Sequence, residues 1–387
     1  MPLALLALTI SAFAIGTTEF VIVGLVPTIA NQLAISLPSA GLLVSIYALG
    51  VAVGAPVLTA LTGRFPRKQL LVALMVLFTA GNILAWQAPD YTTLVIARLL
   101  TGLAHGVFFS IGSTIATSLV PKEKAASAIA IMFGGLTVAL VTGVPLGTFI
   151  GQHFGWRETF LAVSLLGAIA LVTSLLLVPS NIPGRASASL RDQLKVLTHP
   201  RLLIIYAVTA LGYGGVFTAF TFLAPMMQDL AGFSPNAVSW ILLGYGISVA
   251  VGNIWGGKLA DKHGAVPALK FIFAALVVLL MIFQFTASVH YAVLVMGIFA
   301  FGNVPGLQVY VVQKAELYTP NAVDVASGLN IAAFNIGIAL GSIIGGQTVA
   351  HIGLAQTPWI GAVIVLVAFL LIGLSGRLDK PARVALG

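Results

Sequence analysis

Residues 47–68, YALGVAVGAPVLTALTGRFPRK, return 198 residues later at 245–266 as YGISVAVGNIWGGKLADKHGAV. The initial Tyr, the Val-Ala-Val-Gly run, one Leu and a basic residue coincide without a gap. The same offset aligns four upstream pairs: Gly16/Gly214, Leu25/Leu223, Pro27/Pro225 and Ser36/Ser234. The chain is therefore built from two copies of one unit, and its fold should contain two similar halves.

The composition assigns the repeated unit to a membrane. Charged residues are 7% of the 387-residue chain, against about a quarter in soluble domains. Hydrophobic residues are 59% and the mean hydropathy is +1.09, so too few charges remain to cover a soluble surface. Cysteine is absent, which excludes disulfides and thiolate metal sites. We predict an integral membrane protein, and interpret MPLALLALTI as the start of its first span and not as a removed signal peptide.

Twelve apolar stretches are long enough to cross a bilayer as helices, since a span needs roughly 17–25 residues. They are 3–27, 40–62, 69–88, 92–118, 126–151, 158–178, 202–228, 236–259, 267–287, 290–313, 325–350 and 357–376. Long runs between short turns favour helices over the short alternating strands of a membrane barrel. The predicted fold class is an all-α integral membrane protein with twelve transmembrane helices.

The basic residues predict the orientation. With twelve spans both termini lie on one side, and 16 of the 18 Lys and Arg residues fall at or near loops of that side. Arg157 lies opposite and Arg98 lies within a span. The positive-inside rule then predicts a multi-pass protein of the cytoplasmic (inner) membrane with both termini cytoplasmic. This placement explains the net charge of +8 without a nucleic-acid partner.

The repeat relates two six-helix halves of the same orientation, because the copies lie six spans apart. A parallel repeat about an axis along the membrane normal is typical of one large class of secondary transporter, whose halves rock around a central site. We predict an N-terminal half at 1–178, a cytoplasmic linker at 179–201 and a C-terminal half at 202–387. Residues 189–198 of the linker suit a short amphipathic helix. We expect a monomer.

Small residues recur at every fourth position in three spans, and so lie on one helix face. The candidate interface positions are Gly143, Pro145 and Gly147, then Gly252 and Gly256, then Gly337 and Gly341. Such faces allow a neighbouring backbone to approach closely. Two interpretations stay open: static packing, or a sliding seam between the halves.

Several motifs resemble the major facilitator superfamily, and more closely its twelve-span drug:proton antiporter branch, which includes sugar and purine efflux permeases. LTGRFPRK (61–68) is similar to the family's loop between spans two and three and matches at Arg64, Arg67 and Lys68, with Gly63 where the family has Asp. Its second copy, GKLADKHG (257–264), keeps Asp261. The resemblance implies a gating loop, with Asp261 as the carboxylate that latches one conformation.

Two further motifs carry the resemblance into the spans. ARLLTGLAHG (97–106) resembles the family's fourth-span motif, whose intramembrane Arg is here Arg98 and braces the first span. GVPLG (143–147) resembles the fifth-span motif of exporters, although the usual Gly-Pro is here Gly-Val-Pro. Together they imply a proton-coupled exporter.

The first span holds a carboxylate, Glu19, inside FAIGTTEFVIVGLVP (13–27). Because charge is costly in a bilayer, an intramembrane acid faces a cavity or a partner and is usually functional. We predict a proton-coupling cluster of Glu19, Arg98 and His105: burial stabilises the neutral carboxyl, whereas Arg98 stabilises the carboxylate. The alternatives are a structural Glu19–Arg98 pair, and a His105 that is only hydrogen-bonded.

The second half offers neutral hydrogen-bonding groups in place of a deep acid. We predict that Tyr213, Asn303 and Asn335 contact substrate, and we assign Asn330 to packing. The alternative for each Asn is interhelical hydrogen bonding, worth about 0.6 kcal/mol on average.

No enzyme motif, metal-spaced cluster or nucleotide loop occurs, so the sequence predicts no enzyme activity, cofactor or metal. Transport would then be driven by a proton gradient. The predicted function is efflux of a small neutral polar or amphiphilic molecule, such as a sugar, a nucleoside or purine, or a chloramphenicol-like drug. The alternatives are a proton-independent facilitator or importer of the same fold and, more remotely, a membrane sensor without transport.

Overall fold

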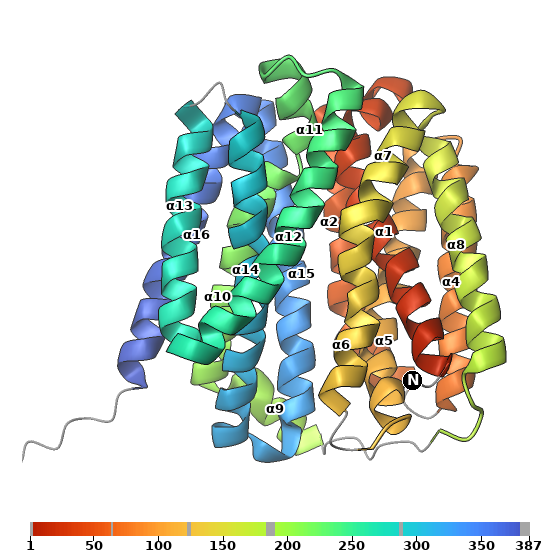
Figure 1. Cartoon of the computed structure of the whole chain (residues 1–387), viewed down its shortest axis with the longest axis vertical. Coiled ribbons are helices and arrows are strands. Elements are labelled where there is room, and N and C mark those ends of the chain that lie inside the picture. The colour runs from red at the N-terminus through yellow and green to blue at the C-terminus, as the bar shows by residue number, and fades with distance from the viewer. Residues whose placement is uncertain (1–2, 63–64, 122–124, 183–189, 286–288, 380–387) are drawn as a thin grey trace, which may run out of the picture.

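The computed structural model describes residues 3–62, 65–121, 125–182, 190–285 and 289–379. Within these ranges the chain is helical and contains no strand. The helices form two groups that stand side by side in Figure 1. The first group contains α1 (Leu3–Gln32), α2 (Leu37–Val53), η1 (Gly54–Leu58), α3 (Thr59–Thr62), α4 (Arg67–Trp86), α5 (Tyr91–Ser118), α6 (Ala125–Val138), η3 (Ala139–Gly143), α7 (Val144–His153) and α8 (Trp156–Leu177).

A short helix, α9 (Leu190–Thr198), precedes the second group and lies within the predicted linker. The second group contains α10 (Pro200–Phe220), α11 (Leu223–Pro225), η4 (Met226–Leu230), α12 (Pro235–His263), α13 (Ala265–Phe285), α14 (Val289–Tyr318), η5 (Pro320–Ala322), α15 (Val323–His351), η6 (Leu354–Gln356) and α16 (Thr357–Leu378). We call the end of the bundle that carries α9 the linker end, and the opposite end the far end (Figure 1).

Twelve helices in the described ranges are long and apolar enough to cross a membrane, which confirms the predicted number. Some predicted starts were late. α2 begins at Leu37 and α12 at Pro235, because Ser36 and Ser234 cap them: each hydroxyl oxygen accepts a bond from a backbone N–H three residues on. A proline in the first turn of each helix needs no donor there. The predicted halves and linker, 1–178, 179–201 and 202–387, stay a prediction.

Three spans are interrupted by π-helical turns, each beside a proline. Pro56 lies inside η1, Pro145 follows η3 closely, and Pro225 precedes η4. Proline lacks the N–H that would bond four residues back, so the backbone register changes by one residue at that point. The hydropathy pattern gave no sign of these turns.

The buried apolar residues form two clusters, and only one joins both groups. The larger cluster combines the far part of α1, from Phe20 to Ala30, and Leu43 of α2 with side chains of α10 to α16. The smaller cluster lies at the linker end and contains only first-group residues, such as Leu8 and Phe78. The two groups therefore share a core toward the far end, while the first group has a separate core at the linker end.

Direct contacts between the groups agree with this division. An added Cβ at Gly346 of α15 would lie 3.5 Å from the Pro38 side chain at the far end. Near mid-span, the Ser45 hydroxyl donates to the Ala339 carbonyl at 3.0 Å. On the other side of the interface, the Ser239 hydroxyl of α12 donates to Gln152 of α7 at 2.9 Å.

The small-residue ladders pack inside the groups and not between them. Each approaches a helix of its own group. The added Cβ atoms would meet Thr17 at Gly143, Val21 at Gly147, Ile298 at Gly252, Gly302 at Gly256, Ala210 at Gly337 and Gly214 at Gly341. Pro145 is buried in the first turn of α7, between the two ladder glycines of that span. These contacts correspond to the static interpretation of the ladders.

A methyl group at Gly341 should destabilise the protein. Its Cβ would lie 2.1 Å from the Gly214 carbonyl oxygen, so α10 and α15 must separate, at a cost of about 1–3 kcal/mol. Gly328, on the same helix, has nothing within 4 Å of an added Cβ. Thermal unfolding should show a lower melting temperature for Gly341→Ala. Gly328→Ala should leave the melting temperature unchanged. Equal melting of the two variants would contradict the packing.

Asp90 should stabilise the far-end start of α5 in a pH-dependent way. Its Oδ1 accepts a bond from the Thr93 N–H at 2.8 Å, and this bond lowers the pKa of the Asp90 carboxyl. A lowered pKa adds stability above the ordinary aspartate value of about 3.9, and that stability is lost as the pH falls. Asp90→Ala should therefore melt below wild type at pH 7, with the difference shrinking below about pH 4. Asp90→Asn should keep the cap; a pH-independent deficit in Asp90→Ala would exclude this account.

Candidate functional site

Glu19 lies near the middle of α1, where the two groups meet. It lines a small cavity, with room for about one water molecule, between the groups. The other lining residues are Phe20, Val44, Tyr47 and Ala48 of the first group and Phe217 and Ile338 of the second. The Glu19 carboxyl group thus lies in a small and mostly apolar cavity between the halves.

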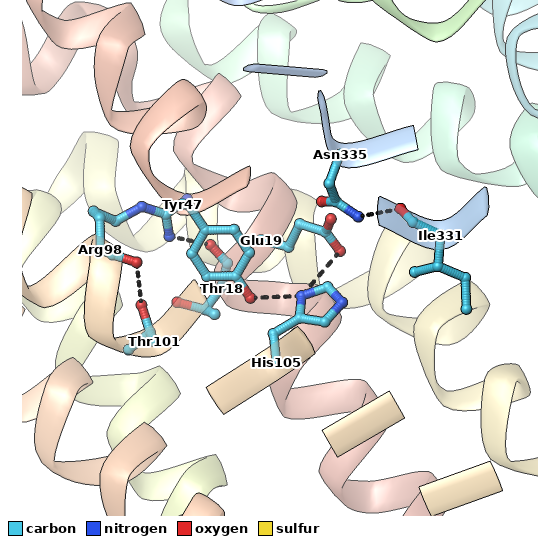
Figure 2. Close-up of polar contacts among 8 residues, drawn as sticks. All are labelled: Thr18, Glu19, Tyr47, Arg98, Thr101, His105, Ile331 and Asn335. Carbon is cyan, nitrogen blue, oxygen red and sulfur yellow. Dashed lines mark hydrogen bonds and ion pairs between the residues drawn. The ribbon is translucent and has the colours of Figure 1, made fainter. Parts of the chain in front are cut away.

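His105 is the ionisable partner of Glu19. Its Nδ1 lies 3.9 Å from Glu19 Oε2, and both side chains are almost fully buried. The same nitrogen is 3.0 Å from the Tyr47 hydroxyl, so Tyr47 of α2 orients the ring of His105 of α5 (Figure 2). The imidazole and the phenol are thus hydrogen-bonded, and the carboxyl lies just beyond hydrogen-bond distance of the same ring nitrogen.

Arg98 is close to this chain but has other partners. Its Nη1 donates to the Thr18 carbonyl at 2.6 Å and its Nε to the Leu43 carbonyl at 3.3 Å, while its guanidinium lies 4.2 Å from the centre of the Tyr47 ring. Among the described residues no ion pair joins Arg98 to Glu19. Arg98 therefore ties α5 to α1 and α2 through backbone carbonyls, and the structural Glu19–Arg98 pair is not formed in this conformation.

Neutral polar pairs hold the helices around the site. In the first group the Thr18 hydroxyl donates to Asn82 Oδ1 at 2.8 Å. In the second, the Thr209 hydroxyl donates to Asn330 Oδ1 at 2.8 Å, and Asn330 Nδ2 donates to Gln308 at 2.9 Å. Both ends of the Asn330 amide are thus bonded within its own half, and its assignment to packing stays a prediction.

The three predicted substrate residues lie on three helices of the second group. The Tyr213 ring of α10 is packed among aromatic rings, 5.7 Å from Phe301 and 4.8 Å from Phe334 between ring centres. Asn335 of α15 follows Phe334 and donates its Nδ2 to the Ile331 carbonyl at 3.0 Å. Asn303 of α14 donates to the Ala300 carbonyl of its own helix at 2.9 Å. Within the described part of the chain, the carbonyl oxygens of both Asn side chains are buried without a donor.

The predicted gating-loop residues are only partly described. Arg64 lies outside the described residues. Arg67 and Lys68 form the first turn of α4 at the linker end. Asp261 is exposed near the end of α12, with no hydrogen bond or ion pair to another part of the described chain.

Two features of the site were not anticipated from the sequence. In the sequence Tyr47 stands out only as the first residue of the repeat, yet its hydroxyl is hydrogen-bonded to His105. Phe20 directly follows Glu19 and contacts Phe217 and Phe301 of the second group, with ring centres 6.5 and 5.9 Å apart. A search for aromatic residues beside the intramembrane acid would have found Phe20, but not its partners.

Comparisons with known proteins agree on the family. The model of the Major Facilitator Superfamily matches residues 8–317 and 209–386. The uncharacterized MFS-type transporter YtbD of Bacillus subtilis is 53% identical, over 98% of this chain and 97% of its own. The inner membrane transport protein YdhP of Escherichia coli K12 is 42% identical over 96% of each chain.

Solved structures show the same fold at low identity. A bacterial homologue of the human lysosomal transporter Spinster, in an inward-facing and occupied conformation, superposes with a TM-score of 0.78 at 18% identity over 98% of each chain. The human organic anion transporter MFSD10 superposes with a TM-score of 0.70 at 16% identity, over 96% of this chain and 98% of its own.

Replacing Arg98 by lysine should destabilise the first group although the charge is kept. One ammonium cannot reach the Thr18 and Leu43 carbonyls together, so a buried hydrogen bond is lost, at about 1–3 kcal/mol. Arg157 is the matched control, because both of its bonds go to one carbonyl, that of Ala88. Arg98→Lys should lower the melting temperature more than Arg157→Lys. Equal melting would argue against the bracing role.

Proposed function

The chain belongs to the major facilitator superfamily and is a multi-pass membrane transporter, and we propose that it exports its substrate in exchange for protons. In this proposal it is a member of the drug:proton antiporter branch, acts as a monomer in the cytoplasmic membrane and has both termini in the cytoplasm. Glu19 carries the proton.

The observation that carries the proposal is the position of Glu19. Its carboxyl is buried between the two groups, it lies 3.9 Å from an imidazole, and among the described residues no Lys or Arg side chain forms an ion pair with it. A buried acid without a Lys or Arg partner is costly in a bilayer while it is charged, and protonation relieves that cost, so such a group is suited to bind and release a proton. A carboxylate needed only for stability would be better served by a direct pair with Arg98.

His105 and Arg98 take different parts in this proposal. His105, oriented by Tyr47, exchanges the proton with Glu19 and connects it to water when the site opens. Arg98 adds positive charge to the region and keeps α1 in place through the Thr18 carbonyl. Proton movement therefore needs Glu19 and His105, while Arg98 holds the helix that carries Glu19 in position.

Alternating access is supported by the uneven packing of the two groups. A shared apolar core joins them toward the far end, and the first group has its own core at the linker end. The positive-inside rule assigns the linker end to the cytoplasm, so this conformation is sealed toward the outside. We assign Arg64, Arg67 and Lys68, with Asp261, to the loops that close the linker end in the opposite conformation.

The rings around the site favour an amphiphilic substrate within the predicted range. Phe20, Phe217 and Phe301 form a contact across the two groups next to Glu19. Aromatic faces suit a ring-bearing molecule of the chloramphenicol or purine kind better than a sugar covered in hydroxyls. Tyr213, Asn303 and Asn335 supply the hydrogen bonds that orient it.

Exchange in liposomes tests the proposal. Liposomes that contain the purified protein and a pH dye are challenged with sugars, purines and chloramphenicol. In wild type one of these compounds should drive proton movement. In Glu19→Gln that movement should fall to the level of protein-free liposomes, because the amide cannot release a proton. Glu158→Gln, in the first turn of α8 near the far end, is the control and should couple normally.

Two outcomes would reverse the proposal. Labelled substrate that crosses without proton movement in wild type would assign a facilitator. Normal coupling in Glu19→Gln would remove Glu19 from the proton path.

A further inference from the structure

We infer that Asn335 is the acceptor that detects the proton on Glu19 from the opposite half of the protein. In this arrangement a protonated Glu19 of α1 donates a hydrogen bond to Asn335 Oδ1 of α15, and the bond exists only while the proton is present. Asn335 is then a positioning residue for the coupling. The inference rests on the proposed function, because it assumes that Glu19 gains and loses a proton.

The amide of Asn335 presents a fixed acceptor with no donor. The residue is 5% exposed, and its Nδ2 is engaged with the Ile331 carbonyl at 3.0 Å. This bond fixes which end of the amide is free: the carbonyl Oδ1, which is buried without a hydrogen-bond partner among the described residues. A buried carbonyl oxygen without a donor costs free energy, so a donor that reaches it stabilises the conformation.

Glu19 is the group that faces this acceptor. In Figure 2 its carboxyl and the Asn335 amide point toward one another from α1 and α15. Ile338, three residues beyond Asn335 and on the same side of α15, lines the Glu19 cavity. The structure gives the Glu19 oxygens no donor bond among the described side chains; the His105 contact, at 3.9 Å, is an ion-pair distance.

The chemistry of the two groups makes the contact depend on protonation. A neutral carboxyl has one O–H to donate, and an amide oxygen can only accept. An ionised carboxylate would instead set one acceptor against another, which repels. Protonation of Glu19 therefore holds α15 against α1, and loss of the proton favours their separation.

The other ionisable neighbours of Glu19 cannot give this signal. Arg98 and His105 of α5 and Tyr47 of α2 belong to the same half as Glu19, so they adjust its ionisation without joining the halves. Tyr213 of α10 lies in the opposite half and stacks on Phe217, which lines the Glu19 cavity. A phenol, however, donates to a carboxylate as readily as it accepts from a carboxyl, so it does not distinguish the two forms. The acceptor-only oxygen of Asn335 does.

Spin-label distances in lipid nanodiscs test the inference without a substrate. The native chain has no cysteine, so Gln87→Cys and Asn236→Cys place one label on each half at exposed far-end positions. Gln69→Cys and Lys262→Cys do the same at the linker end. Wild type should have its far-end labels close together in acid and farther apart in alkali, with the linker-end pair changing in the opposite sense.

Substitution of Asn335 should move this transition toward acid. Asn335→Leu removes the acceptor at similar volume, so the proton is held less tightly and the midpoint should fall by about one pH unit, a tenfold loss in proton affinity. Glu19→Gln keeps a donor and should hold the far end closed at every pH. Asn330→Leu is the control: it removes a buried amide of the same helix that bonds only within its half. It should lower the melting temperature and leave the midpoint unchanged.

The outcomes separate the two levels of inference. An unchanged midpoint in Asn335→Leu, with a pH response that Glu19→Gln abolishes, overturns the role of Asn335 and leaves Glu19 as the proton carrier. A wild type that does not respond to pH, or a Glu19→Gln variant that still does, overturns both. If Asn335→Leu and Asn330→Leu shift the midpoint equally, the effect is one of packing and the inference is wrong. A melting curve for each variant shows that it is folded.

Discussion

A polar side chain within a bilayer has no water to bond to, and this constraint governs the interior of the bundle. Arg98 meets it by donating to the backbone carbonyls of Thr18 and Leu43. The Thr18–Asn82 and Thr209–Asn330 pairs meet it with neutral partners inside each half. Glu19 does not meet it in this way, since its carboxyl accepts no hydrogen bond from a described side chain, and among the described residues the Asn303 and Asn335 carbonyl oxygens are likewise buried without a donor. The hydrogen bonds of the other polar groups hold the helices in place. Glu19 therefore stays at the centre of the interface between the two groups of helices.

The two halves share a backbone design but have diverged in chemistry. Gly54 approaches the Leu103 backbone in the first half, and Gly252 approaches Ile298 in the second, so the same pair of helices packs in the same way. The tyrosines that open the repeat differ. The Tyr47 hydroxyl is bonded to His105, whereas that of Tyr245 is buried with no partner in the described ranges, and the Tyr245 ring stacks on Phe220. The repeat thus supplies two matching helix pairs, and among the described residues only the first pair carries a buried Arg and a buried His.

Hydropathy and the repeat were enough to predict the twelve spans, because each span is marked by a long apolar stretch in the sequence. The Glu19–His105 contact could also be anticipated, since His105 is two helical turns from Arg98 and the family resemblance puts spans one and four together. The hydrogen-bond partners of Arg98 could not be anticipated, because they are backbone carbonyls, which every residue has. The ladder glycines predicted close approach but not which helix approaches, which depends on tertiary packing. The π-helical turns were missed because a proline in a span is compatible with a kink, a wider turn or an unbroken helix.

The unequal division of the apolar core also has a thermal consequence. Opening the far end would admit water to side chains such as Phe222, which fills the space beside Gly41. Hydration of apolar surface raises the heat capacity, by about 0.45 cal/K/mol for each Å² exposed. The enthalpy and entropy of opening therefore both change with temperature, and the balance between the sealed and open forms follows a curve and not a straight van't Hoff line. A transporter built in this way has a temperature of its own at which the far end is most firmly closed.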